Sequence, residues 1–91
     1  MTNKEQIIKD FSELNEDARS RWDYDKLLEL LDYKEDGDKI KLTVGIGRRY
    51  DQTYHDLVID DEGIRIKAET ERNIILYDVI NYVLKPIFFG N

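Results

Sequence analysis

The sequence predicts one α+β domain over residues 1–91, a two-layer sandwich with the element order helix, helix, strand, strand, strand, helix. Apolar residues recur at helical spacing near both ends of the chain, and they alternate with polar residues in between. Short turn-forming segments that contain glycine separate the alternating stretches. We therefore expect a three-stranded antiparallel meander that is covered on one face by helices.

The first helix is predicted to begin after Thr2, which forms a capping-box pattern with Glu5. Its buried side consists of four apolar residues at helical spacing: Ile7, Ile8, Phe11 and Leu14. Asp23 is predicted to cap a second, short helix that ends near Gly37, because glycine suits the left-handed position after a helix. The buried side of this second helix would consist of Leu27, Leu28, Leu30 and Leu31.

From residue 39 onward the apolar residues alternate, which predicts strands over residues 39–46, 53–59 and 64–69 with loops at 47–52 and 60–63. A four-residue second loop keeps one sheet face apolar, whereas a slip of one residue inverts the pattern. The predicted pairs are Ile59 with Ile64, Leu57 with Ile66 and His55 with Ala68. The outward face would carry Lys41, Thr43, Gly45, Asp56, Val58, Arg65 and Lys67.

The last helix is predicted to begin at Thr70 or Asn73 and to be buried along a wide apolar stripe that ends at Leu84. Pro86 cannot continue a regular helix, so we expect the helix to stop or kink there. An apolar tail follows and would close the core of its own chain or contact a second copy: Ile87, Phe88 and Phe89.

The chain contains no cysteine, which excludes disulfides, thiolate metal sites and cysteine nucleophiles. Its polar first residues do not resemble a secretion signal. No segment approaches the roughly 20 apolar residues that a membrane span requires. These features predict a cytoplasmic protein that does not bind membranes.

Catalytic chemistry has little support in the sequence. His55 is the only histidine, and it lies on a strand distant from both serines. The paired carboxylates lie in turns and on polar helix faces, where water solvates them. The segment from Asp32 to Asp38 matches part of a calcium loop, but Lys34 and Thr43 stand where ligands belong. We therefore predict a protein that is not an enzyme and that holds no metal or cofactor.

The net charge of −6 arises entirely from one part of the chain. Residues 1–38 contain twelve acids and six bases, whereas residues 39–91 contain eight of each. Such asymmetry bears on partners and solubility, and it predicts a partner protein with a basic surface, such as a nuclease or another nucleic-acid-binding protein. In size, charge and compactness the chain resembles anti-restriction and anti-CRISPR inhibitors of phages and mobile elements, and also bacteriocin or toxin immunity proteins.

The leading hypothesis is a non-enzymatic protein-binding module of the inhibitor or immunity type. Six carboxylates would steer association, in part as a mimic of DNA phosphates: Asp10, Glu13, Asp17, Asp25, Glu29 and Asp32. Two aromatic residues, Trp22 and Tyr24, would anchor the contact.

Two alternatives stay open. The first is a nucleic-acid-binding domain that uses a hairpin loop and the outward sheet face: Arg48, Arg49, Tyr50, Tyr54, Lys41, Arg65 and Lys67. The acidity of the chain argues against direct nucleic-acid binding, because like charges repel. The second is a small dimeric structural or adaptor domain, because a meander leaves at least one sheet edge open for a homodimer.

Overall fold

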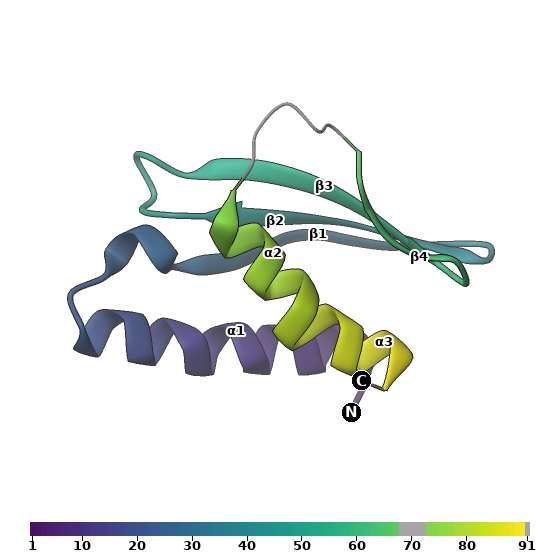
Figure 1. Cartoon of the computed structure of the whole chain (residues 1–91), viewed down its shortest axis with the longest axis horizontal. Helices are drawn as coiled ribbons and strands as arrows, with labels where there is room; N and C mark the ends of the chain where they lie inside the picture. The colour runs from purple at the N-terminus through teal and green to yellow at the C-terminus, as the bar shows by residue number, and fades with distance from the viewer. Residues whose placement is uncertain (68–72, 91) are drawn as a thin grey trace.

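The computed structural model describes residues 1–67 and 73–90 of the chain. Its four strands form one antiparallel sheet in the order β1-β2-β3-β4, and helices cover one face of that sheet (Figure 1). The helical elements are α1 (Asn3–Ser20), the 3₁₀ turn η1 (Tyr24–Lys26), α2 (Ile74–Val79), the π-helical turn η2 (Ile80–Leu84) and α3 (Lys85–Phe89). The strands are β1 (Leu28–Asp36), β2 (Lys39–Ile46), β3 (Thr53–Asp60) and β4 (Gly63–Ile66). The predicted α+β class, with helices on one sheet face, is confirmed.

The predicted second helix is wrong, because the segment forms η1 and then the edge strand β1. Leu28 is buried and Leu30 packs against the core. The register shifts between Leu30 and Asp32, which marks a β-bulge and leaves Leu31 40% exposed. After the bulge, Tyr33 packs against the core again. An alternating strand with one extra residue places its apolar side chains at a spacing that resembles one side of a helix, which explains the wrong prediction. With β1 included, the sheet has four strands instead of three.

Gly37 belongs to a hairpin turn and does not end a helix. Asp36 pairs with Lys39, so that only Gly37 and Asp38 connect β1 to β2. Gly37 has a φ of +62°. Two-residue hairpin turns favour glycine at their first position, because it adopts a positive φ without steric cost.

The predicted register of the last hairpin is confirmed in the described residues: Ile59 pairs with Ile64, and Leu57 pairs with Ile66. Asp60 also pairs with Gly63, so the loop has two residues instead of four in the same register. The predicted pair of His55 with Ala68 lies outside the described residues.

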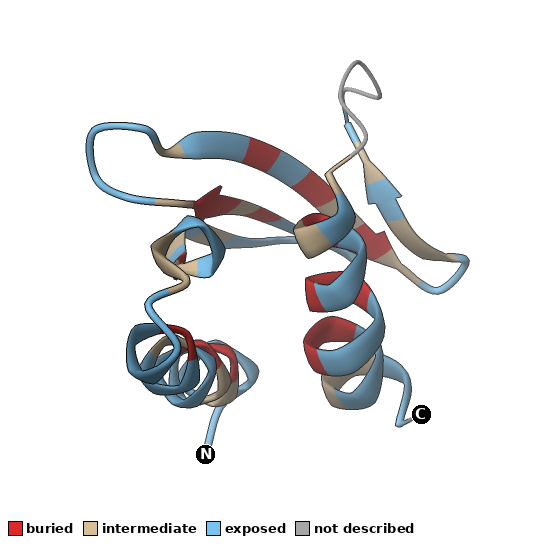
Figure 2. Ribbon diagram, turned by 60° about the vertical axis from the view of Figure 1, so that its left-hand side comes forward, coloured by how far each residue is buried: buried red, intermediate tan, exposed pale blue. Residues whose placement is uncertain are grey.

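The hydrophobic core lies between the sheet and the helices (Figure 2). Val44 of β2 and Leu57 of β3 point into it and are at most 1% exposed. The helices contribute Ile7, Leu76 and Leu84, which are buried to the same extent. Removal of these side chains from water is the largest favourable contribution to the stability of a domain of this size.

Thr2 caps the start of α1 as predicted, and Asn15 further along this helix bonds to the sheet. Thr2 Oγ1 accepts a hydrogen bond from the N–H of Glu5 (3.1 Å) and donates one to Glu5 Oε1 (3.0 Å). Asn15 Nδ2 donates to the C=O of Leu28 (2.8 Å), and Asn15 Oδ1 accepts from the N–H of Leu28 (2.7 Å). The amide of Asn15 thus bonds to the edge strand β1 as a neighbouring strand would.

The C-terminal helical segment begins after Asn73, whose Oδ1 accepts hydrogen bonds from the N–H groups of Ile75 (2.9 Å) and Leu76 (3.3 Å). Of the two predicted caps, Asn73 is therefore the one that the structure supports. The other predicted cap, Thr70, lies outside the described residues.

Pro86 interrupts the regular helix without ending it, because the helical path continues through α3. Proline has no N–H group, and its ring clashes with the carbonyl four residues earlier in an α-helix. The π-helical turn η2 directly precedes α3 and widens the helix at this point. The apolar tail packs on its own core through Ile87 and Phe88. Within the described residues, the helices are too short or too polar to cross a membrane.

Candidate partner-binding site

The end of α1 holds Trp22 in an unusual backbone conformation. The N–H of Trp22 donates to the C=O of Arg19 (3.2 Å), and the N–H of Asp23 donates to the C=O of Ala18 (2.8 Å). These bonds define a Schellman motif, in which the residue at the position of Trp22 is left-handed and is usually glycine. Trp22 has a φ of +57°, a conformation that costs a non-glycine residue about 1–2 kcal/mol.

The side chain of Trp22 does not compensate for this cost by filling the core. It is 80% exposed to solvent. Strained backbone conformations cluster at functional sites such as ligand clamps and switch regions. An exposed tryptophan in a position that favours glycine is therefore the strongest candidate for a contact residue in this fold.

Tyr24 and Arg48 extend the contact region. The ring centroids of Trp22 and Tyr24 lie 5.8 Å apart, and the rings are perpendicular at 89°. The guanidinium carbon of Arg48 lies 4.7 Å from the centroid of the Tyr24 ring, which is a cation–π contact. We name Trp22, Tyr24 and Arg48 the Trp22 surface. It unites the two predicted aromatic anchors with one residue of the alternative hairpin site.

Backbone contacts hold the two parts of the Trp22 surface together. The N–H of Gly47 donates to the C=O of Leu27 (2.8 Å) and joins the end of η1 to the β2–β3 loop. Gly47 has a φ of +106°, and a Cβ at this position would lie 3.2 Å from the carbonyl oxygen of Asp51. This loop conformation therefore requires glycine. The loop is closed by the N–H of Asp51, which donates to the C=O of Arg48 (2.9 Å).

The strain at Trp22 predicts an order of stability among variants. Trp22→Gly and Trp22→Ala both remove the ring, but only glycine relieves the left-handed backbone. We expect Trp22→Gly to be more stable than Trp22→Ala by about 1 kcal/mol in urea unfolding. At Ser12, which is exposed in the middle of α1, the order should reverse, because glycine is unfavourable within a helix. Equal stability of the two Trp22 variants would contradict the assigned strain.

The predicted acidic residues do not form one helical surface, because the second helix is absent. They divide among three elements: Asp10, Glu13 and Asp17 on α1, Asp25 in η1, and Glu29 and Asp32 on β1. Glu29 pairs with Gly45 across the strands. It alternates with Leu28 and Leu30, which lie on the core side, so this pair is on the sheet face that points away from the helices. The regular spacing along two helices, on which the DNA-mimic interpretation depended, is therefore not present.

The cations of the alternative nucleic-acid site are in part paired with acids. Lys41 Nζ lies 3.2 Å from Asp36 Oδ2. Arg65 forms an ion pair with Asp60. Both bases alternate along their strands with residues that pack in the core, so they lie on the outward sheet face as predicted. Their charge is offset there by these carboxylates.

The other residues of that site are dispersed. Arg49 and Tyr54 line an open hollow of about 690 Å³, together with Glu29. Tyr50 is 97% exposed in the β2–β3 loop, and Lys67 is exposed after β4. Gly45 was expected on an open face but is buried, and the nearest side-chain atoms to a Cβ built there belong to Gln52 and Leu31.

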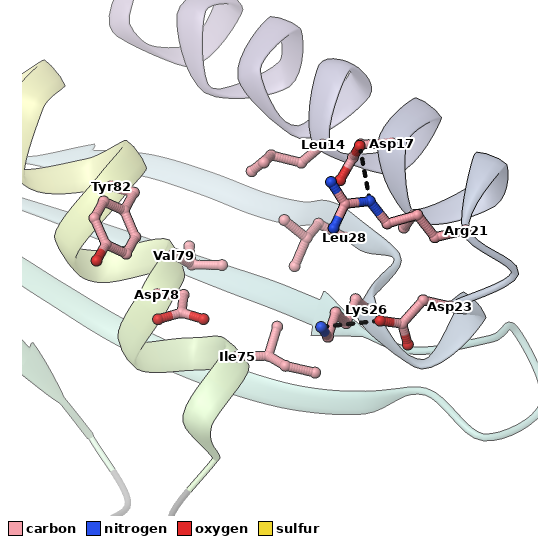
Figure 3. Close-up of a pocket in the computed structure, with 11 residues that line it drawn as sticks. Leu14, Asp17, Arg21, Asp23, Lys26, Leu28, Ile75, Asp78, Val79 and Tyr82 are labelled. Atoms are coloured by element: carbon pink, nitrogen blue, oxygen red, sulfur yellow. Dashed lines mark ion pairs between the residues drawn. The ribbon is translucent and has the colours of Figure 1, made fainter.

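A pocket of about 260 Å³ opens between α1 and α2 (Figure 3). The residues that flank Trp22 in the chain, Arg21 and Asp23, are part of its lining. The pocket was not predicted, because it depends on how far the two helices lie apart. Helical periodicity shows which side of a helix is buried, but not how two helices diverge over a sheet.

His55 is buried on the helix side of the sheet, as predicted, and its Nε2 lies 2.8 Å from Thr53 Oγ1. Among residues 1–67 and 73–90, no group of three or more histidine, aspartate or glutamate side chains is arranged to hold a metal ion. No family model, curated protein or solved structure matches the chain. The function must therefore be inferred from the fold and from the side chains.

Proposed function

We propose that this protein is a non-enzymatic binding module of the inhibitor or immunity type, which contacts a partner protein through the Trp22 surface. The observation that carries the proposal is a tryptophan that is 80% exposed at a φ of +57°. Tryptophan, tyrosine and arginine are the residue types most enriched at interface hot spots. The Trp22 surface contains one of each.

The mutual contacts of the Trp22 surface favour binding. Tyr24 is partly buried and lies between Trp22 and Arg48. The side chains are therefore ordered before a partner arrives. Such preorganisation lowers the entropic cost of association, which otherwise offsets much of the gain from contacts.

The charge of the protein supports a partner with a basic surface. The net charge is −6, and Asp17, Asp23 and Asp25 lie within five residues of Trp22 in the chain. Two of them pair with Arg21 and Lys26, whereas Asp25 forms no ion pair among the described residues. Acidic groups beside an aromatic contact attract a basic partner and accelerate association at low salt.

Nucleic-acid binding through the β2–β3 loop has less support. Arg48 stacks on Tyr24, and both Lys41 and Arg65 are paired with carboxylates. Affinity for a phosphate backbone depends on cations that can replace its counterions. Within the described residues, Arg49 and Lys67 are the two cations of this site without an ion pair or a stacking contact, and the net charge of the protein is already negative.

Affinity capture from a lysate of the source organism tests the proposal. The baits are the wild type and a variant that combines Asp25→Lys, Glu29→Lys and Asp32→Lys. We expect the wild type to capture one basic protein that the charge-reversed variant loses. With the purified partner, the association rate should fall as salt is added, because screening weakens steering by the acids.

Two results would contradict the proposal. A partner that associates at the same rate at low and high salt would not be recognised by charge. Retention of a single-stranded oligonucleotide on a filter at low salt, without any captured protein, would favour the nucleic-acid alternative.

A further inference from the structure

The pocket between α1 and α2 has an apolar floor. Ala18, Leu28 and Val79 form this floor and are at most 7% exposed. Leu14 of α1 and Ile75 of α2 form apolar walls on opposite sides (Figure 3). A volume of about 260 Å³ lies below the usual range for drug-sized ligands and suits one large side chain.

The rim of the pocket carries three carboxylates and two cations, and both cations are already paired. Arg21 Nε lies 3.3 Å from Asp17 Oδ1, and Lys26 Nζ lies 2.9 Å from Asp23 Oδ2. The hydrogen bond to Asp23, and then the charge of Asp23, raise the pKa of Lys26 above its ordinary value. Asp78 lies across the pocket on α2, where its charge also raises the pKa of Lys26, but none of the described cations is within salt-bridge distance of it.

We propose that this pocket receives the side chain of one lysine or arginine residue from the basic partner. The aliphatic stem lies on Leu28 and Val79, and the cation pairs with Asp78. Lysine and arginine bury their methylene stems on apolar surfaces while the charged group stays at a polar rim. Tyr82 lines the same rim and offers its ring to the cation. The inference rests on the proposed function, because it names one contact of the same partner.

Two capped tripeptides test this assignment without the partner. The probes are acetyl-Gly-Lys-Gly-amide and its norleucine analogue, which keeps the aliphatic stem and lacks the ammonium group. In NMR titrations of the ¹⁵N-labelled protein, we expect the lysine peptide to shift the amide signals of Ala18, Asp78 and Val79 with a Kd roughly in the millimolar range. The norleucine peptide should bind about threefold more weakly.

Asp78→Asn should lower the affinity for the lysine peptide about threefold and leave the affinity for the norleucine peptide unchanged. Asp61→Asn is the matched control, because Asp61 is exposed in the β3–β4 turn, away from the pocket. Equal affinity for the two peptides would overturn the role of the cation. If the lysine peptide shifts other amide signals but not those of Ala18, Asp78 and Val79, the assignment of this pocket as the binding site would be overturned.

The outcomes separate this inference from the proposed function. Trp22→Ala should weaken capture of the partner at least roughly 30-fold and leave lysine-peptide binding unchanged, because Trp22 does not line the pocket. If the peptides do not bind but capture still depends on Trp22, only the pocket assignment is wrong. If the lysine peptide binds as expected but no basic partner is captured, the proposed function is wrong and the pocket still binds lysine.

Discussion

Replacing Asn15 with alanine is expected to lower the free energy of unfolding by about 2 kcal/mol. For a domain of this size, that loss lowers the melting temperature by roughly 10 °C. The amide of Asn15 makes two hydrogen bonds to the backbone of Leu28, at 2.7 and 2.8 Å. Alanine leaves both backbone groups of Leu28 without a protein partner at the edge of the sheet. Thermal unfolding followed by circular dichroism measures the effect.

Glu16→Ala is the matched control, because Glu16 is the next residue of α1 and is exposed without a described hydrogen bond. It should change stability by less than about 0.5 kcal/mol. If Asn15→Ala were as stable as Glu16→Ala, Asn15 would not link α1 to β1 as assigned.

Asn15→Asp should also lose stability at neutral pH, because an ionised carboxylate can accept from the N–H of Leu28 but cannot donate to its C=O. The protonated acid restores this donor, so the fold favours the protonated form and raises the pKa of that carboxyl. The hydrogen bond from the protonated carboxyl contributes fully to stability at a pH below the ordinary pKa of aspartate. This contribution is lost as the pH rises through the pKa of the carboxyl in the folded state. The difference in free energy of unfolding between the wild type and Asn15→Asp should therefore become smaller at acidic pH.

The second large effect is expected on binding. Trp22→Ala should weaken binding of the captured partner by at least about 2 kcal/mol, which is roughly 30-fold in Kd. Most of this change should appear in the dissociation rate. Tyr24→Ala should also weaken binding, because it removes the ring that contacts both Trp22 and Arg48. Biolayer interferometry with the purified partner gives both rates.

Tyr50→Ala is the control for these aromatic substitutions. Tyr50 is 97% exposed in the β2–β3 loop that also carries Arg48, but it makes no described ring contact with the Trp22 surface. We expect this variant to keep the affinity of the wild type within about threefold, as most interface and surface residues do. A larger loss for Tyr50→Ala than for Trp22→Ala would place the contact on the loop.

The fold class, the bounds of the first helix and the register of the last hairpin could be predicted because each depends on local periodicity. The predicted buried side of that helix was wrong at Ile8 and Leu14, which are 48% and 44% exposed. The strand β1 was missed because its β-bulge near Leu31 breaks the alternation. A signal for it was present. The pair Gly37-Asp38 between two apolar segments is typical of a two-residue hairpin turn, and that turn requires a strand before residue 37.

Because β1 was predicted as a helix, the sequence did not show that the parts of the Trp22 surface lie together. Trp22 and Arg48 were each selected as candidates, but at two separate sites. Pairing of Leu28 with Ile46 at the start of β1 brings the residues before Leu28 beside the loop that follows Ile46. A correct strand assignment would therefore have predicted that Tyr24 and Arg48 lie close together.

Asn15 and the pocket could not be predicted in this way. Asn15 is one of many polar residues on α1, and the sequence does not show that its amide meets a strand edge thirteen residues later. The pocket depends on the distance between α1 and α2 above the sheet. Both features arise from tertiary packing, which local periodicity does not determine.

Site-specific photo-cross-linking tests the central claim most directly, which is that the partner contacts the end of α1 around Trp22. A benzophenone amino acid is placed at Ser20, which is exposed in the last turn of α1, and separately at Glu62 in the β3–β4 turn. We expect irradiation in cells to give one covalent adduct from position 20, which Trp22→Ala removes, and none from position 62. An adduct from position 62 alone, or one from position 20 that persists in Trp22→Ala, would contradict the claim.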